Sequence, residues 1–93
     1  MKLSDVQQSE GLTGEIDGRE VAAFGRDGQM IVLENVCTHR GCQTIWNPDE
    51  KTWDCPCHGS RFSADGQVIQ GPARAPLKPL RFEVVDDDLK LVE

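Results

Sequence analysis

Two short boxes of cysteine and histidine constrain this sequence more than any other feature. All four cysteines and both histidines fall within residues 37–42 (CTHRGC) and 55–60 (CPCHGS). Each box offers a thiolate and an imidazole a few residues apart, with a glycine where the backbone must turn tightly or approach an inorganic group. In a chain without a secretion signal, this clustering favours a metal centre over a disulfide framework. We therefore expect two loops that grip one metal centre from opposite sides.

The rest of the chain predicts a small all-β domain. At 93 residues and 10.3 kDa it is one domain, and no stretch keeps helical apolar periodicity for three turns. Asp-Gly pairs and one aspartate run are typical of tight hairpin turns. They predict an initial strand 12–16 and three hairpins: 19–24 with 29–33 through Asp27-Gly28, 61–63 with 67–69 through Asp65-Gly66, and 80–85 with 89–92 through 86–88. Such spacing suits an antiparallel sandwich or barrel.

The segment 71–79 (GPARAPLKP) is predicted to be a stiff loop. Its three prolines lack amide donors and fix φ, so it cannot form a central strand. We find no repeat, low-complexity tract or interdomain linker, and we expect residues 1–93 to form a single domain.

The two boxes resemble the Rieske family, whose pattern is Cys-x-His-x-Gly-Cys followed by Cys-x-x-His-Gly. The resemblance is close from about residue 36 to residue 80, which includes the proline-rich segment, and it implies the antiparallel Rieske fold. It also implies a 2Fe-2S cluster with Cys37 and Cys55 on one iron and His39 and His58 on the other. Soft thiolates suit iron and sulfide, and neutral imidazoles make the site easier to reduce than four thiolates would.

The resemblance also implies roles for residues that do not bind iron. In the high-potential branch of the family, the positions of Cys42 and Cys57 form a disulfide that ties the cluster loops together. The serine after His-Gly there donates a hydrogen bond to a bridging sulfide, and a tyrosine two positions later donates one to a cysteine ligand. Ser60 keeps the first donor, but Phe62 has no hydroxyl. The residues expected around the cluster are Gly41, Gly59, Ser60, Phe62 and Pro72.

Two alternatives to an iron-sulfur cluster stay open from the residues alone. A structural zinc site could use the same four ligands, but it would leave two cysteines idle and its ligand spacing would be unusual. A pure disulfide framework would explain neither histidine. Between the boxes, Trp46 and Trp53 are expected to pack in the core and not to relay electrons.

The expected function is one-electron transfer, as a ferredoxin or as the Rieske module of a larger flavin-dependent oxidoreductase. Residues 46–47, 53–54 and 55–62 resemble the C-terminal Rieske domains fused to FAD-dependent oxidoreductases. A soluble fragment of a quinol-oxidising cytochrome complex is the alternative. We do not expect the chain to be a complete oxygenase, because the resemblance assigns both histidines to the cluster and leaves none for a catalytic iron.

The composition of the chain limits which binding partners and which cellular compartment we expect. The formal charge of −6 disfavours nucleic acid and anionic membranes. No apolar run is long enough to span a bilayer, and the N-terminus lacks the layout of a signal peptide. We expect a cytoplasmic protein that is not inserted in a membrane and that exchanges electrons with a redox protein, in particular a flavoprotein, either separate or fused in the native chain.

Overall fold

The computed structural model of this protein describes residues 1–38 and 41–92. These described residues form one short helix, α1 (Leu3–Ser9), and three antiparallel sheets. The first sheet has the order β1 (Gly11–Ile16), β2 (Arg19–Arg26), β3 (Gln29–Glu34). The second has the order β4 (Ile45–Asn47), β5 (Thr52–Asp54), β6 (Arg61–Ser63), β7 (Val68–Gln70), and the third pairs β8 (Phe82–Val85) with β9 (Asp88–Leu91). The predicted antiparallel β fold is confirmed, while α1 was not predicted.

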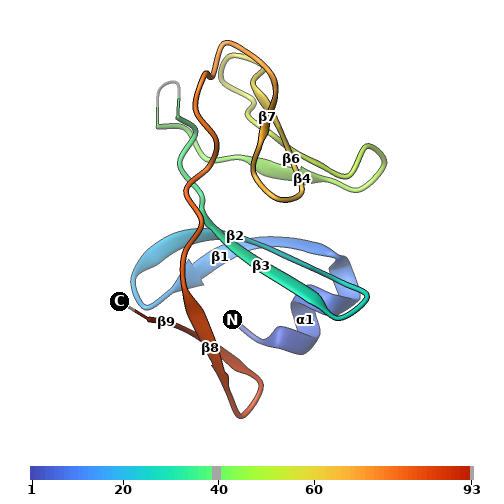
Figure 1. The fold of residues 1–93 in the computed structure, drawn as a ribbon, viewed down its shortest axis with the longest axis vertical. Coiled ribbons are helices and arrows are strands. Elements are labelled where there is room, and N and C mark those ends of the chain that lie inside the picture. The colour runs from blue at the N-terminus through green and yellow to red at the C-terminus, as the bar shows by residue number, and fades with distance from the viewer. Residues whose placement is uncertain (39–40, 93) are drawn as a thin grey trace.

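These sheets form two halves of an elongated molecule (Figure 1). The base contains α1, β1 to β3 and the β8–β9 hairpin, with both chain ends nearby. The second half contains β4 to β7 and the loops that carry the two boxes. Within the described residues, no helix is long and apolar enough to cross a membrane.

Two-residue turns close three of the hairpins. Both central residues have positive φ at Asp17-Gly18 (51° and 81°), Asp27-Gly28 (51° and 83°) and Asp86-Asp87 (49° and 67°). Turns with two positive φ values match the right-handed twist of paired strands, and Asp and Gly tolerate this conformation best. The last turn is therefore shorter than predicted, because Asp88 already pairs with Val85 in the strand ladder.

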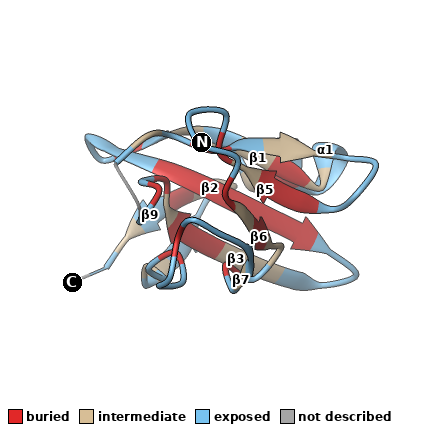
Figure 2. Ribbon diagram, turned by 90° about the horizontal axis from the view of Figure 1, so that it is seen from above, coloured by how far each residue is buried: buried red, intermediate tan, exposed pale blue. Residues whose placement is uncertain are grey.

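Strand β2 is buried on both faces and separates two hydrophobic cores. Val21 and Ala23 pack into a core that lies within the base, whereas Ala22 and Phe24 pack into a core shared with the second half. Successive side chains of a strand point to opposite faces, so this short apolar run supplies both cores. The buried stretch of β2 runs through the centre of the molecule in Figure 2.

The proline-rich segment returns the chain from the second half to the base. Its end pairs with the outer edge of β3, where Glu34 N donates to Lys78 O and Leu80 N donates to Val32 O, both at 2.8 Å. Pro79, which has no amide hydrogen, lies opposite Leu33 at this edge. The segment is not a central strand, as predicted, and β8 begins at Phe82, two residues later than expected.

Trp46 of β4 joins the two halves. Its ring lies 4.7 Å from that of Trp53 and 5.5 Å from that of Phe24, centroid to centroid. It also covers Gly11 so closely that a Cβ there would lie 2.1 Å from the indole Cδ2. Trp53 is fully buried in the shared core, in agreement with its predicted packing role.

Candidate metal centre

The first box forms a loop closed by two backbone hydrogen bonds. Cys37 N donates to Cys42 O at 2.6 Å, and Gly41 N donates back to Cys37 O at 2.8 Å. Gly41 has a φ of 75°, a conformation that costs a side chain about 1 kcal/mol or more. The glycine therefore allows the chain to turn around whatever the loop holds.

The second box repeats this arrangement at the same spacing. Cys55 N donates to Ser60 O at 2.8 Å, Gly59 N donates back to Cys55 O at 3.1 Å, and Gly59 has a φ of 80°. In each loop the first cysteine is bonded to the residue five positions later and to the glycine four positions later. The two boxes are thus matched in backbone structure as well as in sequence.

Buried polar contacts join the two ends of the first loop. Asn35 Oδ1 accepts hydrogen bonds from Thr44 N at 2.8 Å and Thr44 Oγ1 at 2.7 Å, and Asn35 Nδ2 donates to Thr44 O at 3.2 Å. Both residues are 1% exposed. Sequence reasoning missed this pair because nothing in the local pattern relates residues nine positions apart on either side of a loop.

An ion pair joins the two ends of the second loop. Arg61 Nε lies 3.1 Å from Asp54 Oδ1, and the carboxylate also accepts hydrogen bonds from Thr52 Oγ1 and Asn47 Nδ2. Burial raises the pKa of Asp54, but the hydrogen bonds and the Arg61 charge outweigh it and hold the pKa below its ordinary value. The carboxylate is therefore charged at neutral pH and fixes the strands that lead into and out of the box.

The loops bring two buried cysteine sulfurs together. Cys37 is 2% exposed and Cys55 is 3% exposed. Burial raises the pKa of the Cys55 thiol, and the hydrogen bond to the Cys37 side chain raises it further. The amides of Cys57 and His58 donate hydrogen bonds to the Cys55 sulfur and act in the opposite direction. Such amide donors stabilise the thiolate form, which is the form that binds metal.

Cys42 and Cys57 form a disulfide that links the two loops, with an S–S distance of 2.06 Å. The sulfurs of Cys42, Cys55 and Cys57 all lie within 4.8 Å of one another. The disulfide therefore lies directly beside one of the two buried cysteines, and it leaves Cys37 and Cys55 available as ligands.

The proline-rich segment is bonded to both loops. Thr38 Oγ1 donates to Ala75 O at 2.6 Å, and Ala73 N donates to Ser60 Oγ at 3.0 Å. Ser60 is fully buried, and its oxygen accepts that bond, so its own proton can be donated to another group. A buried hydroxyl with a proton to donate, in the loop that begins with the buried Cys55, fits an inorganic group with negatively charged acceptor atoms, such as sulfide.

The other predicted site residues lie around these loops. His58 is exposed, Phe62 is fully buried in the same core as Cys37 and Cys55, and Pro72 is exposed after a cis peptide bond. His39 lies outside the described residues.

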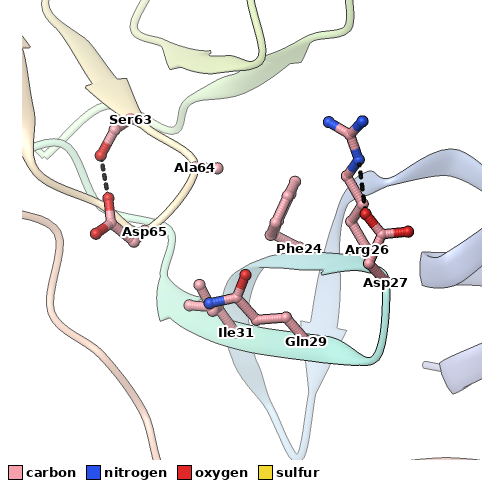
Figure 3. A pocket seen from close by; sticks show the side chains of 8 residues that line it. All are labelled: Phe24, Arg26, Asp27, Gln29, Ile31, Ser63, Ala64 and Asp65. Carbon is pink, nitrogen blue, oxygen red and sulfur yellow. Dashed lines mark hydrogen bonds and ion pairs between the residues drawn. The ribbon is translucent and has the colours of Figure 1, made fainter.

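A pocket elsewhere in the structure is not part of the candidate metal site. A cavity of about 510 Å³ lies between the β2–β3 hairpin and the β6–β7 turn. Figure 3 shows its wall, with Phe24 and Ile31 facing Ala64 across the cavity. The three predicted ligands that the structure describes, Cys37, Cys55 and His58, do not line it, so the box loops and not this pocket form the candidate site.

Two matched loops with paired cysteine sulfurs, a covering proline-rich segment and a small antiparallel β scaffold define an iron-sulfur electron-transfer domain. The family model described as Rieske [2Fe-2S] domain matches residues 1–88. The chain therefore belongs to the Rieske family and binds a 2Fe-2S cluster, the group through which Rieske domains transfer electrons.

Known relatives place the chain within this family. It is 44% identical to YhfW of Bacillus subtilis (strain 168), named as a Rieske 2Fe-2S iron-sulfur protein, over 89% of this chain and 16% of YhfW. It is 46% identical to the cytochrome b6-f complex iron-sulfur subunit 2 of Nostoc sp. (strain PCC 7120), over 83% of this chain and 43% of that subunit. The chain thus spans less than half the length of either relative.

Solved structures give the same fold. The plasma membrane Rieske protein PetC3 of Synechocystis PCC 6803 superposes with a TM-score of 0.82 and 30% identity, covering 99% of this chain and 95% of that one. The ferredoxin of carbazole 1,9a-dioxygenase from Nocardioides aromaticivorans IC177 superposes with a TM-score of 0.71 and 18% identity, covering 98% and 91%. At that identity, the second likeness is one of fold alone.

Proposed function

We propose that the chain is the electron-carrying module of a larger flavin-dependent oxidoreductase and holds its cluster through Cys37, His39, Cys55 and His58. The observation that carries the ligand assignment is the matched closure of the two loops, which places the first cysteine of each box beside the other in the core. When bound, the cluster supplies reversible one-electron chemistry.

Other residues of the chain keep water away from the two sulfurs and provide hydrogen-bond donors for them. The base and the shared core hold the two sulfurs out of water, while the amides of Cys57 and His58 and the hydroxyl of Ser60 are donors for negative charge on sulfur. His58 is exposed, so its side of the site is accessible to a docking partner. A short route between the centre and the surface favours electron exchange with a protein.

The relationship to YhfW supports a fused or multidomain setting. The match covers nearly the whole of this chain but only 16% of YhfW, as expected when a Rieske module is part of a long polypeptide. A flavoprotein is the proposed donor or acceptor, because box 55–62 and the residues before it resemble Rieske domains fused to FAD-dependent oxidoreductases. We also propose a cytoplasmic location and a single domain with the cluster-binding segment at about residues 36–80.

A quinol-oxidising complex is the second candidate. The 46% identity to a cytochrome b6-f iron-sulfur subunit and the disulfide beside Cys55 favour it. The two candidates differ in the potential they require, because a partner of quinol-oxidising complexes needs a potential near the top of the Rieske range of about −150 to +300 mV.

Voltammetry of the purified protein distinguishes the flavoprotein setting from the quinol-oxidising complex. The flavoprotein setting predicts a potential clearly below the top of that range, together with rapid reduction by the flavoprotein encoded in the same open reading frame or next to it. A potential at the top of the range, with rapid reduction by a quinol-oxidising complex and none by the flavoprotein, would favour the second candidate. Fractionation of the native host tests the cytoplasmic location.

A further inference from the structure

A groove lies on the base, on the flank where β9 ends. It has a volume of about 520 Å³ and runs between the β1–β2 turn, the segment 78–81 and the end of β9. Its polar lining consists of Arg19, Lys78, Arg81 and Asp17. Figure 1 places the end of β9 in the base, whereas the box loops lie in the other half of the molecule.

This groove is cationic although the chain carries a net charge of −6. Asp17 is the acidic residue of the lining, and its Oδ2 accepts a hydrogen bond from Leu91 N at 3.0 Å, which fixes the carboxylate in place but leaves it charged. Arg19 is paired with Glu34 at 2.7 Å. Lys78 and Arg81 are exposed and have no carboxylate partner within the described part of the chain.

Most other cations of the described residues are neutralised. A carboxylate lies within ion-pair distance of Lys2, Arg26, Lys51 and Arg61. With Arg19 paired to Glu34 and Asp17 charged, Lys78 and Arg81 leave the groove with an excess of positive charge, in a chain whose formal net charge is −6. Such an excess attracts carboxylates and orients an incoming acidic segment.

Backbone hydrogen bonds fix the groove walls. Lys78 O accepts a bond from Glu34 N, and Arg81 O accepts one from Val92 N at 2.9 Å. Leu80 and Val92 supply apolar lining between the charged groups, and Val92 is 37% exposed. Because the walls are already ordered, little conformational entropy would be lost when a ligand binds.

We propose that this groove binds an acidic segment of the redox partner, in which carboxylates pair with Lys78 and Arg81 and an apolar side chain packs against Leu80 and Val92. Pro79 lacks an amide donor at this edge, so recognition is by side chains and not by addition of a strand. Held at the base, the partner leaves the box loops accessible for electron exchange.

Peptide titration tests this proposal on the cluster-loaded protein. The probe is a fluorescent eight-residue peptide of alternating Glu and Leu, and its counterpart carries Lys in place of Glu. We expect the Glu peptide to bind, to bind more weakly as salt is raised, and to shift the amide resonances of Leu80 and Leu91. Lys78→Glu and Arg81→Glu should each weaken binding on the order of tenfold, about 1.4 kcal/mol.

Lys90→Glu is the matched control, because Lys90 is exposed on β9, has no ion pair within the described residues and does not line the groove. It changes the net charge equally and should alter affinity less than about twofold. Equal weakening by Lys90→Glu, or equal binding of the Lys peptide, would overturn the proposal. So would concentration-dependent dimerisation that Lys78→Glu abolishes, because the occupant would then be a second copy of the chain. An unchanged cluster spectrum in each variant shows that the fold is intact.

Discussion

The amide of Ala73 donates a 3.0 Å hydrogen bond to the hydroxyl oxygen of Ser60, and both residues are buried. This bond occupies one lone pair of the hydroxyl oxygen and leaves its proton free to be donated to another acceptor. It also links the second box to the proline-rich segment. The position of this hydroxyl is the basis for the first prediction.

Ser60→Ala should lower the reduction potential. A donor to charged sulfur stabilises the electron-rich reduced state, and bonds to charged groups contribute ~1.5–3 kcal/mol. If about 1–2 kcal/mol of this differs between oxidation states, the potential falls by roughly 40–90 mV. Voltammetry at one pH measures the change. Ser63→Ala, which removes a hydroxyl outside the site, is the control, and an unchanged potential in Ser60→Ala would contradict the assigned bond.

Phe62→Tyr should raise the potential. Phe62 is fully buried in the core that contains Cys37 and Cys55, and it stands where the high-potential branch of the family has a tyrosine that donates to a cysteine ligand. The expected rise is roughly of the size estimated for one donor, some tens of millivolts. Phe24→Tyr adds the same hydroxyl elsewhere in this core and should leave the potential nearly unchanged. A fall in Phe62→Tyr would show that the ring edge points away from the cluster.

The four cysteines should divide into two functional pairs. Cys37→Ser and Cys55→Ser should abolish the normal cluster, because each removes an iron ligand. Cys42→Ser and Cys57→Ser should still allow assembly but shorten the lifetime of the cluster, since a bridge across a separation of 15 residues contributes about 3 kcal/mol in the chain-entropy model. Visible absorbance followed over time compares the variants, and equal loss in all four would refute the division.

Asn35→Ala should destabilise the fold and loosen the contact between the two ends of the first loop. It leaves the buried amide and hydroxyl of Thr44 without the acceptor Asn35 Oδ1, at about 1–3 kcal/mol for each buried group. For a domain of this size, each kcal/mol lowers Tm by roughly 4–8 °C. Thermal unfolding measures the effect, with the exposed Gln43→Ala in the same loop as control. A Tm equal to that of the control would show that water replaces the lost bonds.

Sequence reasoning predicted the parts of the fold that local patterns encode. The Asp-Gly turns located most of the hairpins because positive φ at two successive positions is a strong local requirement. The boxes located the loops because their residues carry both the chemistry and the turns. Strands β4 and β5 were missed, since three residues are too few to show an alternating pattern.

The remaining features depend on contacts between distant segments. The seven residues of α1 are too few to be stable alone, and the helix is held by burial of Val6 in the base core. Likewise, the Asn35–Thr44 pair and the pairing of Lys78–Leu80 with β3 exist only once the chain has folded. The position of His39 stays a prediction, because it lies outside the described residues.

Metal and sulfide analysis of the purified protein, combined with EPR of the reduced state, tests the central claim most directly. After anaerobic expression with adequate iron, the proposed ligand set predicts about two irons and about two acid-labile sulfides per chain, with the EPR signal of a mixed cysteine–histidine cluster. One zinc per chain without iron would contradict it, because the four ligands would then form a structural site without redox chemistry.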